Sequence, residues 1–204
     1  MTTVQEEYNR LAYKYDSKRS AFMEKITNAV IWQFTYFPKD FSPKRVLDIG
    51  CGTWTLLYKV QKLYPDTELI GIDISRWMLD VARKKLPDAT FLEGDFATID
   101  LPHASYDLIV SSAAFHFMGN YEHIFEKVSW LMSPSAQYSF CDYCREWLFI
   151  PIDLYLTTFF SGKPAMCSRW VYKLGKQYGL TVDWLRKFWY KHFHMMTWFG
   201  WLNK

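Results

Sequence analysis

The sequence predicts an α/β domain whose core is a mostly parallel, doubly wound sheet of seven strands. From Arg45 onward, short apolar runs typical of strands alternate with runs of helical periodicity, in the order 46–49, 56–63, 68–74 and 78–86. Such alternation favours parallel strands that are joined by helical crossovers. A tight turn with two glycines directly after the first run supports this interpretation, because it leads from a strand into a helix.

The later elements follow from the same periodicities. Three more strands are expected at 90–92, 107–111 and 137–142, with a helix between the last two. The buried face of that helix is expected to consist of Tyr121, Ile124, Phe125, Val128 and Leu131. Two aromatic runs, 180–189 and 195–202, are expected to complete the sheet as an antiparallel hairpin.

The whole chain, residues 1–204, is predicted to form one domain. No internal repeat, low-complexity tract or long linker divides it. Two segments with apolar residues at helical spacing, 4–15 and 22–37, precede the first strand. Residues 1–40 are therefore expected to be two N-terminal lid helices, and residues 45–204 the core.

Composition limits the classes of partner. Half of the residues are apolar, the net charge is only +3, and the basic residues are scattered, so a nucleic-acid surface is not expected. Four cysteines, Cys51, Cys141, Cys144 and Cys167, are expected to be free thiols in a chain of this size. The C-x-x-C pair has no second pair beside it, so no metal site is expected.

The sequence also bears on location. Residues 1–30 mix charged with apolar residues and contain no signal-peptide core, so a cytoplasmic protein is expected. An apolar run at 147–160 is too short to span a bilayer and is interrupted by Pro151. We expect no integral membrane segment; this run could cover a pocket or make transient contact with a membrane surface.

The residues best suited to bind a ligand are concentrated around the glycine turn. Gly50, Cys51 and Gly52 leave bare backbone between a strand and a helix, which lets a ligand approach closely. Asp73 ends the next strand, where one carboxylate could accept hydrogen bonds from two ribose hydroxyls. A dinucleotide site would place a third glycine at the position of Thr55.

Four motifs together resemble those of the class I S-adenosylmethionine-dependent methyltransferases. They are D-x-G-x-G at 48–52, G-I-D at 71–73, E-G-D-F at 93–96 and Y-D-L-I-V at 106–110. The resemblance extends from residue 45 to about residue 143. It implies a Rossmann-like fold, S-adenosylmethionine as cofactor, and methyl transfer to a small, partly apolar or aromatic acceptor.

The resemblance also implies roles for individual residues. The methionine half of the cofactor would lie against Gly50, Cys51 and Gly52, with Asp48 close by. The ribose would lie on Asp73 with Ile74 beside it, and the adenine against Asp95 and Phe96. Further contacts are implied for Ser111 and Ser112, at the end of the fourth strand, and for Tyr15, in the lid.

His116 follows the fourth strand, where many relatives carry a histidine beside the acceptor. Methyl transfer needs a base only if the acceptor must lose a proton, and His116 is then the first candidate. Structural interpretations remain open: Asp48 could satisfy backbone donors, Asp95 could cap the next segment, and His116 could be a core histidine. The polar stretch 142–146 could contact the acceptor or form a solvated loop.

Trp54 departs from the family pattern, which usually has glycine at this position. Its ring could displace the loop, lower cofactor affinity, or leave a binding protein without catalysis; we expect it on the acceptor side.

Two alternative functions remain open. One is a nicotinamide-dependent oxidoreductase, which shares the sheet and the ribose carboxylate, and the other is a non-catalytic cofactor-binding protein.

Overall fold

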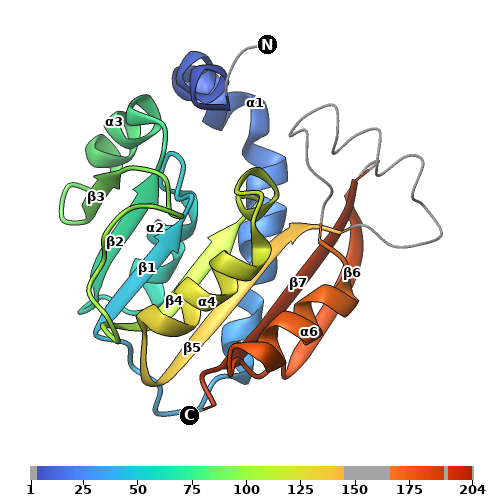
Figure 1. The fold of residues 1–204 in the computed structure, drawn as a ribbon. Helices are drawn as coiled ribbons and strands as arrows, with labels where there is room; N and C mark the ends of the chain where they lie inside the picture. Colours follow the sequence, from blue (N-terminus) through green and yellow to red (C-terminus); the bar gives the residue numbers. More distant parts are fainter. Residues whose placement is uncertain (1–3, 145–165, 191–192, 204) are drawn as a thin grey trace.

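The computed structural model describes residues 4–144, 166–190 and 193–203. These residues form a seven-stranded sheet in the order β3-β2-β1-β4-β5-β7-β6 (Figure 1). The strands are β1 (Arg45–Ile49), β2 (Glu68–Asp73), β3 (Thr90–Glu93), β4 (Tyr106–Ser112), β5 (Met132–Tyr143), β6 (Trp184–Tyr190) and β7 (Phe193–Trp201). Strands β1 to β5 pair in parallel, and β7 pairs antiparallel with both β5 and β6. The predicted seven-stranded, mostly parallel sheet is confirmed.

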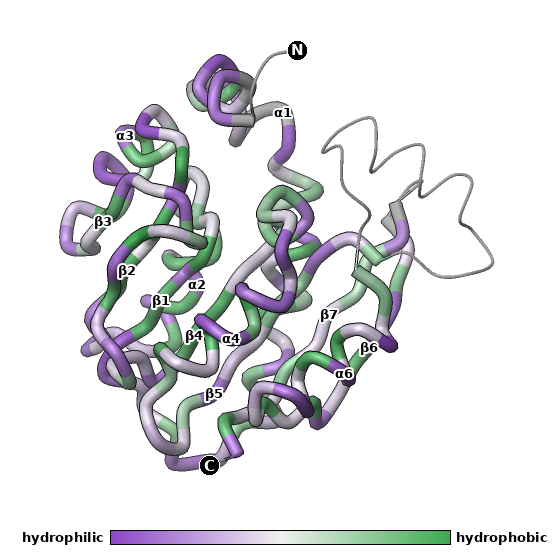
Figure 2. Tube along the Cα trace, in the orientation of Figure 1, coloured by the Kyte–Doolittle hydropathy of each residue, from purple (hydrophilic) through white to green (hydrophobic). Residues whose placement is uncertain are grey.

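Helices cover both faces of this sheet. On one face lie α1 (Val4–Gln33), α2 (Thr55–Leu63) and α3 (Arg76–Lys85), and on the other lie α4 (Tyr121–Leu131) and α6 (Ser168–Gln177) (Figure 1). The predicted face of α4 is buried throughout. Ser75 caps α3 as its Oγ accepts a hydrogen bond from the backbone N–H of Met78 at 3.2 Å. Hydrophobic residues are concentrated along the central strands, where both layers meet (Figure 2).

The N-terminal region differs from the prediction of two helices. Val4 to Gln33 form one continuous helix, α1, followed by a short 3-10 helix, η1 (Phe34–Tyr36). The residues between the two predicted segments contain neither glycine nor proline, so nothing in them ends a helix. Ile26 and Val30, in the second half of α1, are fully buried against the sheet, whereas Tyr15, in the first half, packs with Met78 of α3.

The aromatic C-terminal runs are strands because β7 is an internal strand that is covered on both faces. Successive residues of a strand point to opposite faces, so Trp198 and Phe199 enter different cores. Trp198 packs with Phe140 at 5.7 Å between ring centres, and Phe199 packs with Tyr36 at 5.6 Å. This two-sided burial explains a strand without alternating polarity.

Trp54 precedes α2 in a backbone conformation that side chains rarely adopt. Its φ is 143° and its ψ is −20°. The ring lies edge-on to Tyr58 of α2, 4.9 Å between ring centres, and 5.6 Å below the ammonium of Lys85 of α3. The ring therefore packs between two helices, and the strained backbone is stabilised by the contacts of its side chain.

This geometry predicts an unusual order of stability for two variants. Trp54→Gly and Trp54→Ala both remove the ring, but only alanine keeps a Cβ at a φ of 143°. We expect Trp54→Gly to be more stable than Trp54→Ala by about 1 kcal/mol in urea unfolding.

Tyr58 supplies the matched control, because it lies inside α2 with ordinary helical backbone. There the order reverses, with Tyr58→Gly less stable than Tyr58→Ala by about 1 kcal/mol. Equal stability of the two Trp54 variants would show that the turn stores no strain.

Candidate active site

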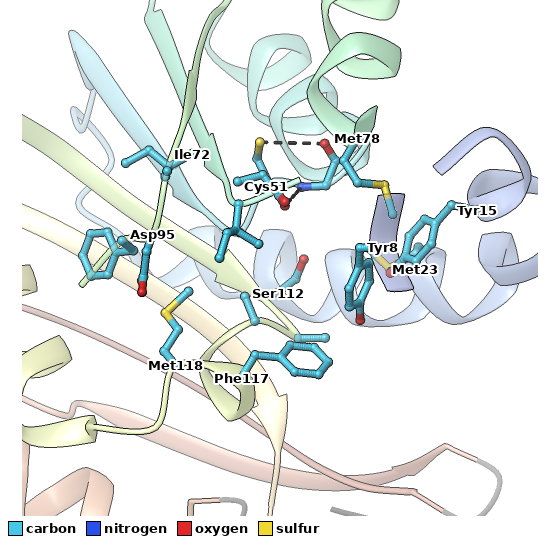
Figure 3. Close-up of a pocket in the computed structure, with 18 residues that line it drawn as sticks. Tyr8, Tyr15, Met23, Cys51, Ile72, Met78, Asp95, Ser112, Phe117 and Met118 are labelled. Atoms are coloured by element: carbon cyan, nitrogen blue, oxygen red, sulfur yellow. Dashed lines mark hydrogen bonds between the residues drawn. The ribbon is translucent and has the colours of Figure 1, made fainter. Parts of the chain in front are cut away.

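A pocket opens where the carboxyl ends of β1, β2 and β4 meet. Ligands of open parallel sheets bind at this edge, where the strand order reverses between β1 and β4. The pocket contains about 960 Å³ of empty space, counted out to its mouth. Figure 3 shows its walls, which come from the glycine turn, from the ends of β2, β3 and β4, and from α1.

Two glycines shape the turn at the centre of the pocket. Gly50 has a φ of 68°, and a Cβ there would lie 2.3 Å from the Cβ of Ala114. Gly52 has a φ of 57°, and a Cβ there would meet nothing within 4 Å. Gly50 therefore permits the close approach of the loop after β4, whereas Gly52 turns bare backbone toward open space.

Asp73 ties the end of β2 to this turn. Its Oδ2 accepts a hydrogen bond from the backbone N–H of Gly52 at 2.9 Å, and its Oδ1 accepts one from Ser75 at 2.8 Å. Burial raises the pKa of Asp73, and these two hydrogen bonds act against that rise. Asp73 and its neighbour Ile74, the residues expected at the ribose, line the pocket, and two hydrogen bonds hold the carboxylate in one orientation.

Asp48 does not line the pocket. It lies on β1 beneath the glycine turn, between Gly71 of β2 and Val110 of β4, and is 1% exposed. Neither of its oxygens has a hydrogen-bond partner in the described part of the chain. Burial, with a contribution from the nearby Asp73, raises the pKa of Asp48 well above its usual value.

Of the two serines expected at the end of β4, only the second lines the pocket. The Oγ of Ser111 donates to the carbonyl of Ile49 at 2.8 Å, which ties β4 to β1. Ser112, the next residue, lines the pocket instead, together with Ala113 and Ala114. The sequence motif ends at this strand but does not reveal which of two adjacent serines points inward.

The opposite end of the pocket carries the two residues implied for adenine. Asp95 and Phe96 both line the wall. Asp95 is exposed, and its Oδ1 also accepts a hydrogen bond from Ala97 N at 2.9 Å, so it caps the next turn as well. Phe96 is buried, and the ammonium of Lys127 lies 5.2 Å from its ring centre. Met118 completes this end.

The first half of α1 covers the pocket from above. Tyr15 lines it as predicted, and so do Tyr8 and Met23 of the same helix (Figure 3). The ring of Tyr8 lies 6.0 Å from that of Tyr15 and 5.4 Å from that of Phe117. Sequence reasoning missed Tyr8, although it stands seven residues before Tyr15, which places both on one face of a helix.

Side-chain hydrogen bonds attach this lid to the rim. Gln5 Nε2 donates to the carbonyl of Ile74 at 2.9 Å, and Ser75 Oγ donates to Asn9 Oδ1 at 2.7 Å. Burial is the largest cause of the raised pKa of Tyr8, and Tyr15 beside it adds to the rise. The phenol of Tyr8 is therefore a neutral hydroxyl beside the rings of Tyr15 and Phe117.

His116 lies directly behind the pocket wall. It follows β4 in a second 3-10 helix, η2 (Phe115–Phe117), and is 5% exposed. Phe117, whose ring centre is 3.9 Å from that of His116, lines the pocket, whereas His116 does not. His116 Nδ1 is 2.7 Å from Oδ1 of Asp142, the first residue of the polar stretch 142–146.

The structure corrects the expected position of Trp54. Its ring packs against Tyr58 and Lys85, outside the set of residues that line the pocket. It therefore lies neither in the methionine part nor on the acceptor side. The unusual φ of Trp54 is what turns the side chain away while the glycine turn keeps its shape.

The remaining expectations concern metal, thiols and membrane. All four cysteines are free, as predicted. Within the described ranges, no cluster of three or more histidine, cysteine or acidic residues could hold a metal ion. No helix among the described residues is long and apolar enough to cross a bilayer. The apolar run 147–160 lies outside the described residues.

Comparison with known sequences agrees with this geometry. Residues 46–135 match a family model described as a methyltransferase domain. The malonyl-[acyl-carrier protein] O-methyltransferase of Halalkalibacterium halodurans is 30% identical over 138 residues, which are 63% of this chain and 51% of that protein. A trans-aconitate 2-methyltransferase from an Acidovorax species is 30% identical over 95 residues, or 47% and 36%. The chain spans about half or less of these relatives.

Solved structures share the fold over the whole chain. A chain from the complex of the Haloferax volcanii methyltransferase activator Trm112 with a methyltransferase-like protein has a TM-score of 0.81 at 17% identity, covering 99% of this chain and 100% of that one. An S-adenosylmethionine-dependent methyltransferase from Clostridium acetobutylicum has a TM-score of 0.73 at 15% identity, covering 97% and 99%. The motifs gathered around one pocket thus lie in a chain that is similar to a methyltransferase domain over residues 46–135 and that shares its fold with S-adenosylmethionine-dependent methyltransferases of known structure.

Proposed function

We propose that this protein transfers the methyl group of S-adenosylmethionine to a small, partly apolar or aromatic acceptor. One observation carries the proposal. A single pocket is lined by Asp95 at one end, by Asp73 and the glycine turn in the middle, and by the aromatic rings of the lid at the other end. That order corresponds to adenine, ribose and methionine, followed by the acceptor.

The residues present fit the cofactor part by part. Asp73 is already oriented by Gly52 and Ser75, so its remaining lone pairs can accept ribose hydroxyls. The open space above Gly52 admits the methionine half. Bound there, the cofactor supplies an activated methyl group on a sulfonium. The chain itself has to align donor with acceptor and exclude water, which the lid helix accomplishes.

The acceptor end favours a partly apolar molecule. Tyr8, Tyr15, Met23 and Phe117 supply aromatic and thioether surface there. The two curated relatives are named for malonyl-[acyl-carrier protein] and trans-aconitate, which both carry carboxylates, and this supports carboxylate-bearing metabolites among the first acceptors to test. Because the cysteines are free thiols, we include a cytoplasmic location in the proposal.

Neither alternative function is favoured over this proposal. The oxidoreductase interpretation rested on a shared sheet and carboxylate, and Thr55 stands where a dinucleotide site has glycine. The non-catalytic interpretation rested on Trp54, whose ring packs outside the pocket. Neither has a further observation in its favour.

Asp73 is the first residue to test. Asp73→Ala removes the ribose acceptor together with the hydrogen bond that orients Gly52. We expect calorimetric affinity for S-adenosylmethionine to fall by about 1 to 3 kcal/mol, the scale for charge-assisted hydrogen bonds. Asp80→Ala, on α3 outside the pocket, should leave the affinity unchanged. Unaltered binding by the Asp73 variant would contradict the site assignment.

His116 is expected to matter only when the acceptor loses a proton. In that case His116→Ala should reduce kcat about a hundredfold or more and leave cofactor affinity near normal, because the imidazole stands behind the wall and not in it. The exposed His103→Ala variant serves as control. A turnover within about twofold of the parent would make His116 a structural residue.

A further inference from the structure

Arg19 stands among three tyrosines where α1 packs against the end of β5. It lies one helical turn after Tyr15 and one before Met23, and both of these residues line the pocket. The guanidinium carbon of Arg19 is 5.8 Å from the ring centre of Tyr15. Burial is the largest cause of the raised pKa of Tyr8 and of Tyr143, and the charge of Arg19 acts against the rise in both. The guanidinium is therefore close to phenols from two elements, α1 and β5.

The positive charge of Arg19 has no anionic partner in the part of the chain that the structure describes. Arg19 takes part in none of the ion pairs between described residues. Two carboxylates act on the neighbouring phenols, Asp73 on Tyr8 and Asp142 on Tyr143. Both accept hydrogen bonds from backbone N–H groups instead. The guanidinium is thus available to an anion that enters from outside the protein.

The hydroxyl of Tyr8 is a second donor at the same end of the pocket. Its ring lines the wall beside Phe117 (Figure 3), and its Oη forms no hydrogen bond to any described residue. The hydroxyl of Tyr15, by contrast, donates to Sδ of Met23 at 3.5 Å. A protonated phenol in a partly apolar wall favours a ligand that supplies an acceptor oxygen, because buried polar groups are rarely left unpaired.

We propose that Arg19 and Tyr8 bind a carboxylate of the methyl acceptor, so that the acceptor is an organic anion with an apolar remainder. The inference rests on the proposed function and names the class of its acceptor. The planar guanidinium offers paired N–H donors that match the two oxygens of a carboxylate, and Tyr8 Oη adds a further donor. The rings of Tyr15 and Phe117 face the apolar remainder.

The cofactor also carries a carboxylate, in its methionine half, so the two sources of this anion have to be distinguished. The open space for the methionine half lies above Gly52, in the turn after β1. Arg19 acts on Tyr143 at the end of β5, and β4 lies between β1 and β5 in the sheet. Two strand spacings amount to about 10 Å, which places the charge of Arg19 nearer the acceptor than the turn.

The first experiment compares two carboxylates, benzoate and hexanoate, with their neutral amides. Each is titrated by NMR into protein that is saturated with S-adenosylhomocysteine, the demethylated cofactor. We expect the parent to bind each acid at least about tenfold more tightly than its amide. Arg19→Met should abolish this preference, Arg19→Lys should retain part of it, and Tyr8→Phe should weaken binding of the acids about threefold or more.

Arg10→Met is the matched control, because Arg10 is an exposed arginine of the same helix. It should leave the preference unchanged, and urea unfolding of each variant verifies that it is folded. A parent with equal affinity for acids and amides, or a preference that persists in Arg19→Met, would overturn the inference. A loss of more than about threefold in affinity for S-adenosylmethionine in Arg19→Met would also overturn it, because Arg19 would then bind the cofactor's carboxylate.

The second experiment measures methyl transfer to a series of carboxylic acids and to matched uncharged alcohols. With the best acid as acceptor, Arg19→Met should raise KM at least about tenfold and change kcat by less than about threefold. If the parent methylates only uncharged acceptors, the proposed function stands and the acceptor class inferred from Arg19 is wrong. If the parent does not bind S-adenosylmethionine, the proposed function itself is contradicted.

Discussion

The hydrogen bonds that Asp73 accepts from Gly52 and Ser75 are the constraint on which the site depends. They join the end of β2 both to the turn after β1 and to the start of α3, so three elements meet at one carboxylate. Gly50 completes the arrangement because only a residue without a Cβ leaves room for Ala114 after β4. A pocket between strand ends is stable here because backbone N–H groups that would otherwise lack partners are satisfied by this side chain.

One helix, α1, contributes both to the hydrophobic core and to the lid over the pocket. The second half of α1 buries Ile26 and Val30 against the sheet, and the first half places Tyr8 and Tyr15 over the pocket. A continuous backbone hydrogen-bond ladder connects the two halves, so the position of the lid follows from the packing of the core. Attachment to the rim through Gln5 adds a second, weaker restraint, because a single exposed hydrogen bond contributes little net free energy.

Two buried aspartates, Asp142 and Asp48, lie beneath the pocket, and they differ in the hydrogen-bond donors that surround them. Asp142 accepts hydrogen bonds from three backbone N–H groups and faces His116. Asp48 is equally buried but has no such partners in the described residues, and burial raises its pKa. The same side-chain type is therefore surrounded by hydrogen-bond donors at one place below the pocket and by none at another.

The sequence by itself determined the alternation of strands and helices, the glycine turn and the acidic strand end, because these depend on local periodicity and on spacing along one stretch of chain. The resemblance to methyltransferase motifs implied that Asp95 and Tyr15 contact the cofactor, and both line the pocket. Only the tertiary structure decided that Trp54 turns outward, that the N-terminal region is one helix, and that Asp142 faces His116 across 26 positions. Backbone torsion at a single residue and contacts between distant strands leave no periodic signal, so they become visible only when the chain is folded.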